Sequence, residues 1–186
     1  MIAPARDGRG WVPTIAVAVI MVGWLIVLAT ALAATPDKNL LPADQPLDVG
    51  AGVVVNVPEG WSRAGSSAAA LPEGVSIQKQ GVIVSFLAEI FPGTTEELFQ
   101  EQRVSIEEDL TLFQAPPPEG VRVAGDLPGL QTGFSGTVGG VRVEGRLTVA
   151  TSSDLGVVVV AYSSSGQMAS ARDELTQMIT SMKVPR

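Results

Sequence analysis

LQTGFSGTVGGVRVEGRLTVA, residues 130–150, is the stretch of the chain that decides its fold. From Val141 to Ala150 apolar residues alternate with polar ones, which is the period of a strand with one apolar face. The glycines at positions 139 and 140 accept the positive φ values of a two-residue hairpin turn. The stretch therefore predicts two antiparallel strands, 130–138 and 141–150, joined by a tight turn.

Five more segments predict strands, because most of them repeat the same alternation. The last of them is apolar on both faces, which is typical of a central strand covered on both sides. Together with the hairpin they give about seven strands. The five segments are 53–57, 75–78, 82–89, 121–124 and 157–162.

Two segments have the helical period. Thr94 and Glu97 match a capping box, which opens a helix that we expect to end near Leu112. A second helix is expected over 166–182. The order strands, helix, strands, helix predicts an α+β domain, in which two helices pack on an antiparallel sheet. The apolar stripes are Phe99, Ile106, Leu110 and Phe113 in the first helix, and Met168, Ala171, Leu175, Met178, Ile179 and Met182 in the second.

Ahead of this domain, Thr14–Ala34 contains twenty-one residues without a formal charge. As a helix this run is roughly 31 Å long, about the hydrocarbon thickness of a bilayer. Arg6 and Arg9 precede it and the segment after it is acidic, so the positive-inside bias places the N-terminus in the cytoplasm. We therefore expect a single-pass protein of the plasma membrane.

The predicted organisation has four parts. Residues 1–11 form a cytoplasmic N-terminus, and residues 12–34 form a transmembrane helix in the lipid bilayer. Residues 35–50 hold three prolines and no apolar period, so we expect an extended tether there. Residues 51–186 form the extracytoplasmic α+β domain.

A cleaved signal peptide is the alternative interpretation of the N-terminal run. Ala31-Leu32-Ala33 is a small-x-small site, so cleavage would fall near Ala33. The run is longer than a usual signal-peptide core, which favours a retained anchor. In a retained helix, small residues let a second helix approach closely. The candidates for such packing are Ala29, Thr30, Ala33 and Ala34.

Composition excludes several classes of function. The chain has neither histidine nor cysteine, which rules out Ser-His-Asp and Cys-His nucleophiles, zinc sites built on these residues, and disulfides. Without Arg6, Arg9 and Asp7, the chain's 12 basic and 19 acidic residues become ten and eighteen, a net charge of −8 for the exported part. That charge argues against nucleic acid and against attachment to anionic lipid headgroups. We expect no enzyme activity, no cofactor and no metal; a carboxylate-based hydrolase is the catalytic alternative.

Two short motifs have simpler structural explanations. Ser76 and Lys79 match S-x-x-K, a pattern of some acyl-transfer enzymes, but their surroundings have the period of a strand. On a strand, residues three apart point to opposite faces. The acidic run 107–109 predicts a solvated helix face, because consecutive helical carboxylates do not converge on one ion.

Four residues are candidates for contact with a partner or ligand: Trp61, Pro116, Pro117 and Pro118. Trp61 ends a Pro-Glu-Gly-Trp turn, and the prolines form a stiff connector that a partner can dock on. The methionines of the last helix (168, 178 and 182) would suit a lipid-accepting groove, although core packing explains their spacing as well.

Short phrases along the domain resemble the PsbP-type α/β/α sandwich, whose members include the photosystem II extrinsic subunit, a yeast Ran-binding factor and actinobacterial membrane-anchored envelope proteins of the trehalose monomycolate transport factor type. The resemblance covers about residues 51–184 and implies a non-catalytic docking domain. The phrases are NVPEGW (56–61), TxEEL (94–98), LPGLQ (127–131) and ELxxMIxSM (174–182).

The expected function is that of a membrane-anchored extracytoplasmic accessory or scaffold protein. Its domain would bind a membrane protein complex or an envelope protein. The alternative is an envelope lipid or glycolipid carrier, or transport factor, that uses a cleft in the sandwich.

Overall fold

The computed structural model describes residues 40–43, 45–65, 71 and 73–185. These residues all belong to one compact unit. The predicted transmembrane helix 12–34 and its packing candidates Ala29, Thr30, Ala33 and Ala34 lie outside the described residues. Within the described part, no helix has the length and apolar character needed to cross a membrane.

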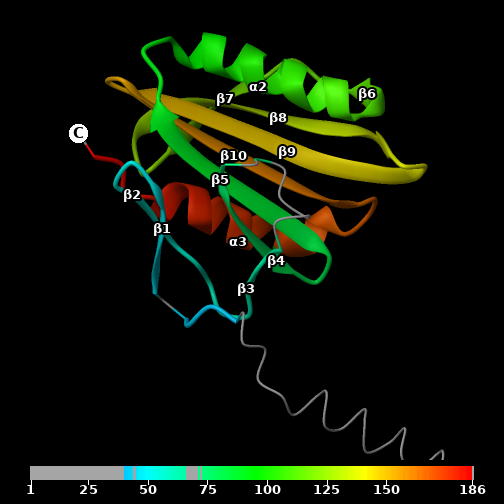
Figure 1. The fold of residues 1–186 in the computed structure, drawn as a ribbon, viewed down its shortest axis with the longest axis horizontal. Coiled ribbons are helices and arrows are strands. Elements are labelled where there is room, and N and C mark those ends of the chain that lie inside the picture. The colour runs from blue at the N-terminus through cyan, green and yellow to red at the C-terminus, as the bar shows by residue number, and fades with distance from the viewer. Residues whose placement is uncertain (1–39, 44, 66–70, 72, 186) are drawn as a thin grey trace, which may run out of the picture. The chain divides into compact units, whose positions relative to one another are not determined.

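The described unit contains ten strands and two helices, so it is an α+β fold with a large antiparallel sheet (Figure 1). In chain order the elements are β1 Pro46–Gly50, β2 Val53–Asn56, β3 Ser62–Arg63, β4 Val75–Lys79, β5 Val82–Ile90, α2 Thr95–Asp109, β6 Thr111–Gln114, β7 Glu119–Val123, β8 Leu127–Val138, β9 Val141–Ser152, β10 Leu155–Ser164 and α3 Met168–Ser181.

The main sheet has the order β3-β4-β5-β10-β9-β8-β6, and β7 also pairs with β8. The hairpin predicted from residues 130–150 is confirmed as β8 and β9, since Val138 pairs with Val141 across Gly139 and Gly140. These glycines have φ values of 55° and 84°. The predicted central strand is confirmed as β10, which lies between β5 and β9.

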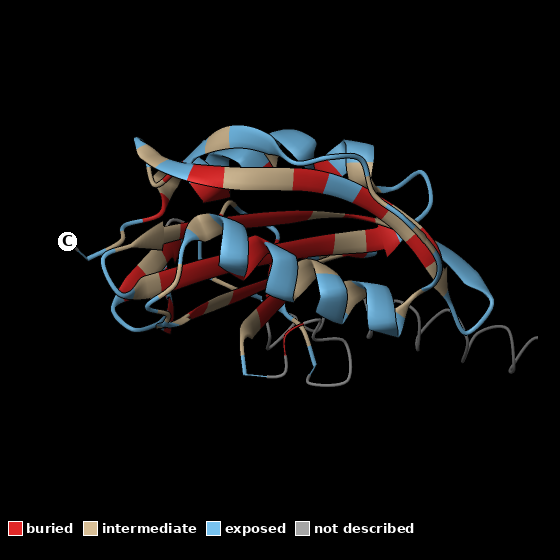
Figure 2. Cartoon of the chain, turned by 90° about the horizontal axis from the view of Figure 1, so that it is seen from above, coloured by how far each residue is buried: buried red, intermediate tan, exposed pale blue. Residues whose placement is uncertain are grey.

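The sheet is covered by a different layer on each face (Figure 1). Helix α2 packs on one face, which we call the α2 face. Helix α3 and the β1–β2 hairpin share the other, which we call the α3 face. Figure 2 shows buried residues along the strands and exposed residues on the outer sides of the helices. The apolar strand residues therefore supply the two cores.

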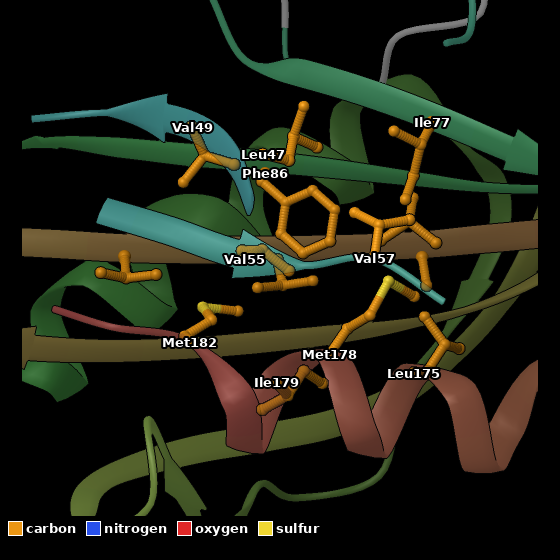
Figure 3. Close-up of a cluster of buried hydrophobic side chains, with 14 of the residues drawn as sticks. Leu47, Val49, Val55, Val57, Ile77, Phe86, Leu175, Met178, Ile179 and Met182 are labelled. Carbon is orange, nitrogen blue, oxygen red and sulfur yellow. The ribbon is translucent and has the colours of Figure 1, made fainter. Parts of the chain in front are cut away.

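The core of the α3 face joins three elements that are far apart in sequence. Figure 3 shows Val55 and Val57 of the β2 segment, Phe86 of β5, and Leu175 and Met178 of α3 gathered in one cluster. The stripe predicted for the last helix is confirmed, because all of its members except the half-buried Met168 are buried. Ordinary core packing therefore explains Met178 and Met182.

The predicted tether over 35–50 is wrong for its second part. Residues 46–50 form β1, which pairs with β2, and Leu47 and Val49 are buried in the core of the α3 face. The period of two in this segment is short and lies among prolines and charges, so it does not stand out in the sequence. The strands β1, β3 and β6 are not predicted from the sequence, so the described residues contain ten strands instead of the predicted seven.

Helix α2 ends earlier than predicted. The capping box is confirmed: the Glu97 amide donates to Thr94 Oγ1 at 3.2 Å, and the Thr94 amide donates to Glu97 Oε2 at 2.8 Å. The helix stops at Asp109, however, and Leu112 lies in β6 with φ of 56°. Pairing of β6 with β8 supplies hydrogen bonds in place of a last helical turn.

Candidate functional site

An apolar cleft on the α2 face is the candidate site. It lies between the C-terminal end of α2 and the strands β8, β9 and β10, and its volume is about 500 Å³. Its lining is apolar except for Asp109 and the phenol of Tyr162. The lining residues are Ile106, Asp109, Leu110, Phe134, Val138, Val141, Val143, Val160 and Tyr162.

The early end of α2 opens this cleft. Leu147 and Val149 of β9 are 1 % exposed, whereas Val141, on the same face near the hairpin turn, is 58 % exposed. Val138, paired with Val141 across the turn, is 50 % exposed. The apolar face of β9 therefore continues beyond the end of α2, and its residues beside the hairpin turn are not covered by the helix.

The floor of the cleft depends on a close approach between Phe134 and Gly145, which are paired on β8 and β9. A β-carbon at Gly145 would overlap the Phe134 ring and would lie 2.7 Å from the carbonyl oxygen of Ala161. Phe113 packs beside the same ring, with centroids 6.2 Å apart. Glycine at 145 thus lets an aromatic ring lie against the sheet and form the cleft floor.

Asp109 and Tyr162 supply the polar groups of the cleft. Burial raises the pKa of the Tyr162 phenol above its usual value near 10, so the side chain is neutral at physiological pH. Asp109 belongs to the exposed acidic run 107–109 in the last turn of α2, a turn without a basic residue. Apolar surface beside an exposed carboxylate is suited to binding a ligand or a partner.

Trp61 is a core residue, so the prediction that it contacts a partner is wrong. Its side chain is fully buried, and its Nε1 donates to Glu174 Oε2 at 2.6 Å. Glu174 also forms an ion pair with Lys79 at 2.7 Å. The turn that delivers Trp61 looks like a surface loop in sequence, but helix α3 supplies its partner.

Pro116, Pro117 and Pro118 are exposed, in the connector between β6 and β7. The connector is attached to the sheet, since Thr132 Oγ1 donates to the carbonyl oxygen of Pro116 at 2.8 Å. The prolines do not line the apolar cleft. They stay available for contact, and their role as a docking surface stays a prediction.

The strand explanation of the Ser76 and Lys79 motif is confirmed. Both residues lie on β4, where Ser76 shares a hydrogen bond of 2.7 Å with Ser85 and is buried. Lys79 points to the α3 face, toward Glu174. The serine and lysine therefore lie on opposite faces of the sheet. Sequence reasoning misses Leu98, which belongs to α2 and is buried with Phe99 against the sheet, because the predicted stripe begins at Phe99.

No protein-family model and no curated protein sequence matches the chain. Solved structures do share its fold. CyanoP, the cyanobacterial PsbP of Synechocystis, has a TM-score of 0.56 and 13 % identity, over 82 % of this chain and 99 % of that one. LpqN, described as involved in cell envelope biogenesis of Mycobacterium tuberculosis, has a TM-score of 0.51 and 14 % identity, over 76 % and 90 %.

A protein from Bacteroides thetaiotaomicron has a TM-score of 0.54 and 11 % identity, over 78 % of this chain and 50 % of that one. At such identities the likeness concerns the fold alone. The PsbP-like fold expected from the short sequence phrases is thus confirmed for the described domain.

Proposed function

We propose that this chain is a membrane-anchored extracytoplasmic accessory protein, and that its domain docks a partner in the apolar cleft beside α2. The observation that carries the proposal is the open apolar end of the α2 face, where Val138 and Val141 line the cleft and are 50 % and 58 % exposed. Apolar residues clustered beside a concave surface are typical of an interaction site.

The last turn of α2, whose Asp109 lines the cleft, specifies the chemistry of the partner. Three exposed acidic residues, Glu107, Glu108 and Asp109, occupy the last turn of α2, where the helix dipole is already negative. Both the acidic side chains and the helix dipole would favour a positive charge on a partner at this position. The occupant we propose is therefore an amphipathic segment with basic residues, from a membrane protein complex or an envelope protein.

The location rests on the uncharged run Thr14–Ala34 and on the arginines ahead of it. The proposal of a non-catalytic role rests on the absence of histidine and cysteine from the sequence and on the single carboxylate in the cleft lining.

A photo-crosslinking amino acid in the full chain, expressed in its native cells, tests the docking surface. Placed at Val141, it should give one discrete adduct whose crosslinked peptide is amphipathic and basic. Ile90 is a matched control, because it is 83 % exposed and lies at the opposite end of the sheet. The triple change Glu107→Gln, Glu108→Gln and Asp109→Asn should weaken the adduct.

Absence of an adduct at Val141, or an equal adduct at Ile90, would contradict the proposal. An adduct that is insensitive to the triple change would contradict the basic character of the partner.

The second candidate function is that of a lipid or glycolipid carrier. It is favoured by the apolar lining residues Phe134, Val143 and Val160 and by a volume within the usual range of ligand pockets. Native mass spectrometry of the full chain should then show a bound lipid, and Val143→Phe, which fills the cleft, should remove it. A lipid-free wild-type chain would exclude this candidate.

A further inference from the structure

A second groove lies on the α3 face, over β8 and β9 and beside the first turns of α3. Its volume is about 780 Å³, and its lining mixes charged and polar side chains with apolar ones. Arg146 and Leu147 are neighbours on β9 but point to opposite faces, so the sheet separates this groove from the apolar cleft. The polar side chains used below are Glu119, Gln131, Glu144, Arg146 and Arg172.

Two arginines from different elements meet at this groove. Arg146 is half-buried on β9, and Arg172 is exposed on α3. Among the described residues, neither guanidinium has an ion pair or hydrogen bond. Burial and the neighbouring charge of Arg172 lower the pKa of Arg146, and Glu119 raises it by a smaller amount. Glu119 therefore offsets only part of the repulsion between the two cations.

The carboxylates nearby are bonded to other groups. Glu144 Oε1 accepts hydrogen bonds from the amides of Gly166 at 2.8 Å and Met168 at 3.1 Å, so its charge stabilises the start of α3. Glu119 Oε1 accepts a hydrogen bond from Gln131 Nε2 at 3.3 Å. Both carboxylates thus accept hydrogen bonds from amide groups, and neither is hydrogen-bonded to the two arginines.

The groove has room for an anion beside Arg146. Gly133 is paired with Arg146 across β8 and β9. A β-carbon at Gly133 would have the carbonyl oxygen of Gly145, 3.8 Å away, as its only neighbour within 4 Å. The missing side chain therefore leaves open space next to the guanidinium.

We propose that this groove binds a phosphate group through Arg146 and Arg172. Guanidinium groups match phosphate oxygens in pairs, and a doubly charged phosphate balances two cations better than a single carboxylate does. The strong negative charge of the domain opposes general attraction to anionic surfaces, so binding depends on this local pair. The phosphate belongs either to a soluble phosphate ester or to a lipid headgroup.

Calorimetric titration of the detergent-solubilised full chain with inorganic phosphate, at constant ionic strength against chloride, tests the site. Wild type should bind phosphate, and Arg172→Gln should weaken binding about tenfold or more. Arg146→Gln should have the same effect. Arg172 is exposed on a helix, so its variant should fold even if the strand variant does not.

Two further variants separate the site from general charge effects. Gly133→Val fills the groove without changing charge and should also weaken phosphate binding. Arg142→Gln removes the same charge from an exposed position on the same strand and should leave binding unchanged. Absence of phosphate binding in wild type, or equal loss in Arg142→Gln and Arg172→Gln, would overturn the proposal.

Competition distinguishes the two sources of phosphate. Glycerol phosphate added in solution should displace inorganic phosphate if the ligand is a soluble ester. Displacement only by phosphatidic acid, in nanodiscs of phosphatidylcholine that hold the full chain, identifies a lipid headgroup. Failure of both competitors to displace phosphate would contradict the proposed ligand class.

Discussion

On the α3 face of the sheet, a helix and a hairpin together cover the strands, whereas on the α2 face a single helix ends before the β8–β9 turn. Among the described residues, the core cluster of the α3 face contains twenty-one buried apolar residues and that of the α2 face contains eight. Apolar strand residues occur on both faces, so the covering layer determines which of them reach solvent. The α3 face supplies most of the stability, and the α2 face keeps apolar surface available for binding.

The largest expected difference between the faces is in the cost of deleting a side chain. Phe86→Ala in the core of the α3 face should lower the free energy of unfolding by about 3–5 kcal/mol, because it leaves a cavity in a closed core. Val141→Ala at the cleft rim should change it by less than about 0.5 kcal/mol. Urea unfolding of both variants measures this, and equal losses would contradict the asymmetry.

The paired glycines of β8 and β9 give a smaller contrast. Gly145→Ala should cost about 1–3 kcal/mol, because its methyl group would overlap the Phe134 ring and press on the Ala161 carbonyl. Gly133→Ala, in the adjacent pair of the same ladder, adds its methyl group to open space and should be close to neutral. If urea unfolding showed the same cost for both changes, the tight floor of the cleft would be disproved.

The ion pair under α3 should contribute less. Glu174→Gln removes the charge that pairs with Lys79 and weakens the hydrogen bond from Trp61. The side chains of Lys79 and Glu174 are 22 % and 32 % exposed, so solvent screens the pair. We expect a loss of about 1 kcal/mol that shrinks at high salt. Glu101→Gln on the exposed side of α2 is the control, and an equal loss there would show that the pair contributes nothing specific.

The smallest expected effect is the pH dependence at the cleft. Tyr162 is the only tyrosine of the chain, so the absorbance of the phenolate reports on it alone. Its pKa is raised by folding, and therefore the unfolded state loses the proton first as the pH rises. Stability should be unaffected below pH about 10 and should fall above it.

The titration midpoint should lie above that of the urea-unfolded chain. Coincident midpoints would contradict the half-buried position of the phenol.

Local patterns were enough to predict the elements whose partners are close in sequence. The periodicity of apolar residues alone predicts the β8–β9 hairpin, the strand β10 with two apolar faces, and the apolar stripe of α3. The positions of β1 and β6 do not follow from periodicity, because pairing with other strands fixes them and their own apolar patterns are short. The burial of Trp61 does not follow from local patterns for a related reason, since its partner Glu174 lies 113 residues further along the chain.

The candidate sites were harder to predict than the fold. The apolar cleft depends on where α2 ends relative to the sheet, and the capping box marks only where that helix begins. Arg146 and Arg172 line the same groove because α3 packs beside β9. No local sequence pattern predicts that packing. The alternation along β9 predicts that Val141 lies on the apolar face of the strand, but only the position of α2 shows that this end of the face is exposed.

Labelling of single cysteines in living cells tests the central claim most directly, because the natural chain contains no cysteine. Val141→Cys and Ile90→Cys in the full chain are treated with a membrane-impermeant maleimide, before and after detergent solubilisation. We predict that both positions react in intact cells, and that position 141 reacts more slowly there than in detergent while position 90 does not. Reaction only after lysis would contradict the extracytoplasmic location, and equal rates at position 141 in cells and detergent would contradict the docked cleft.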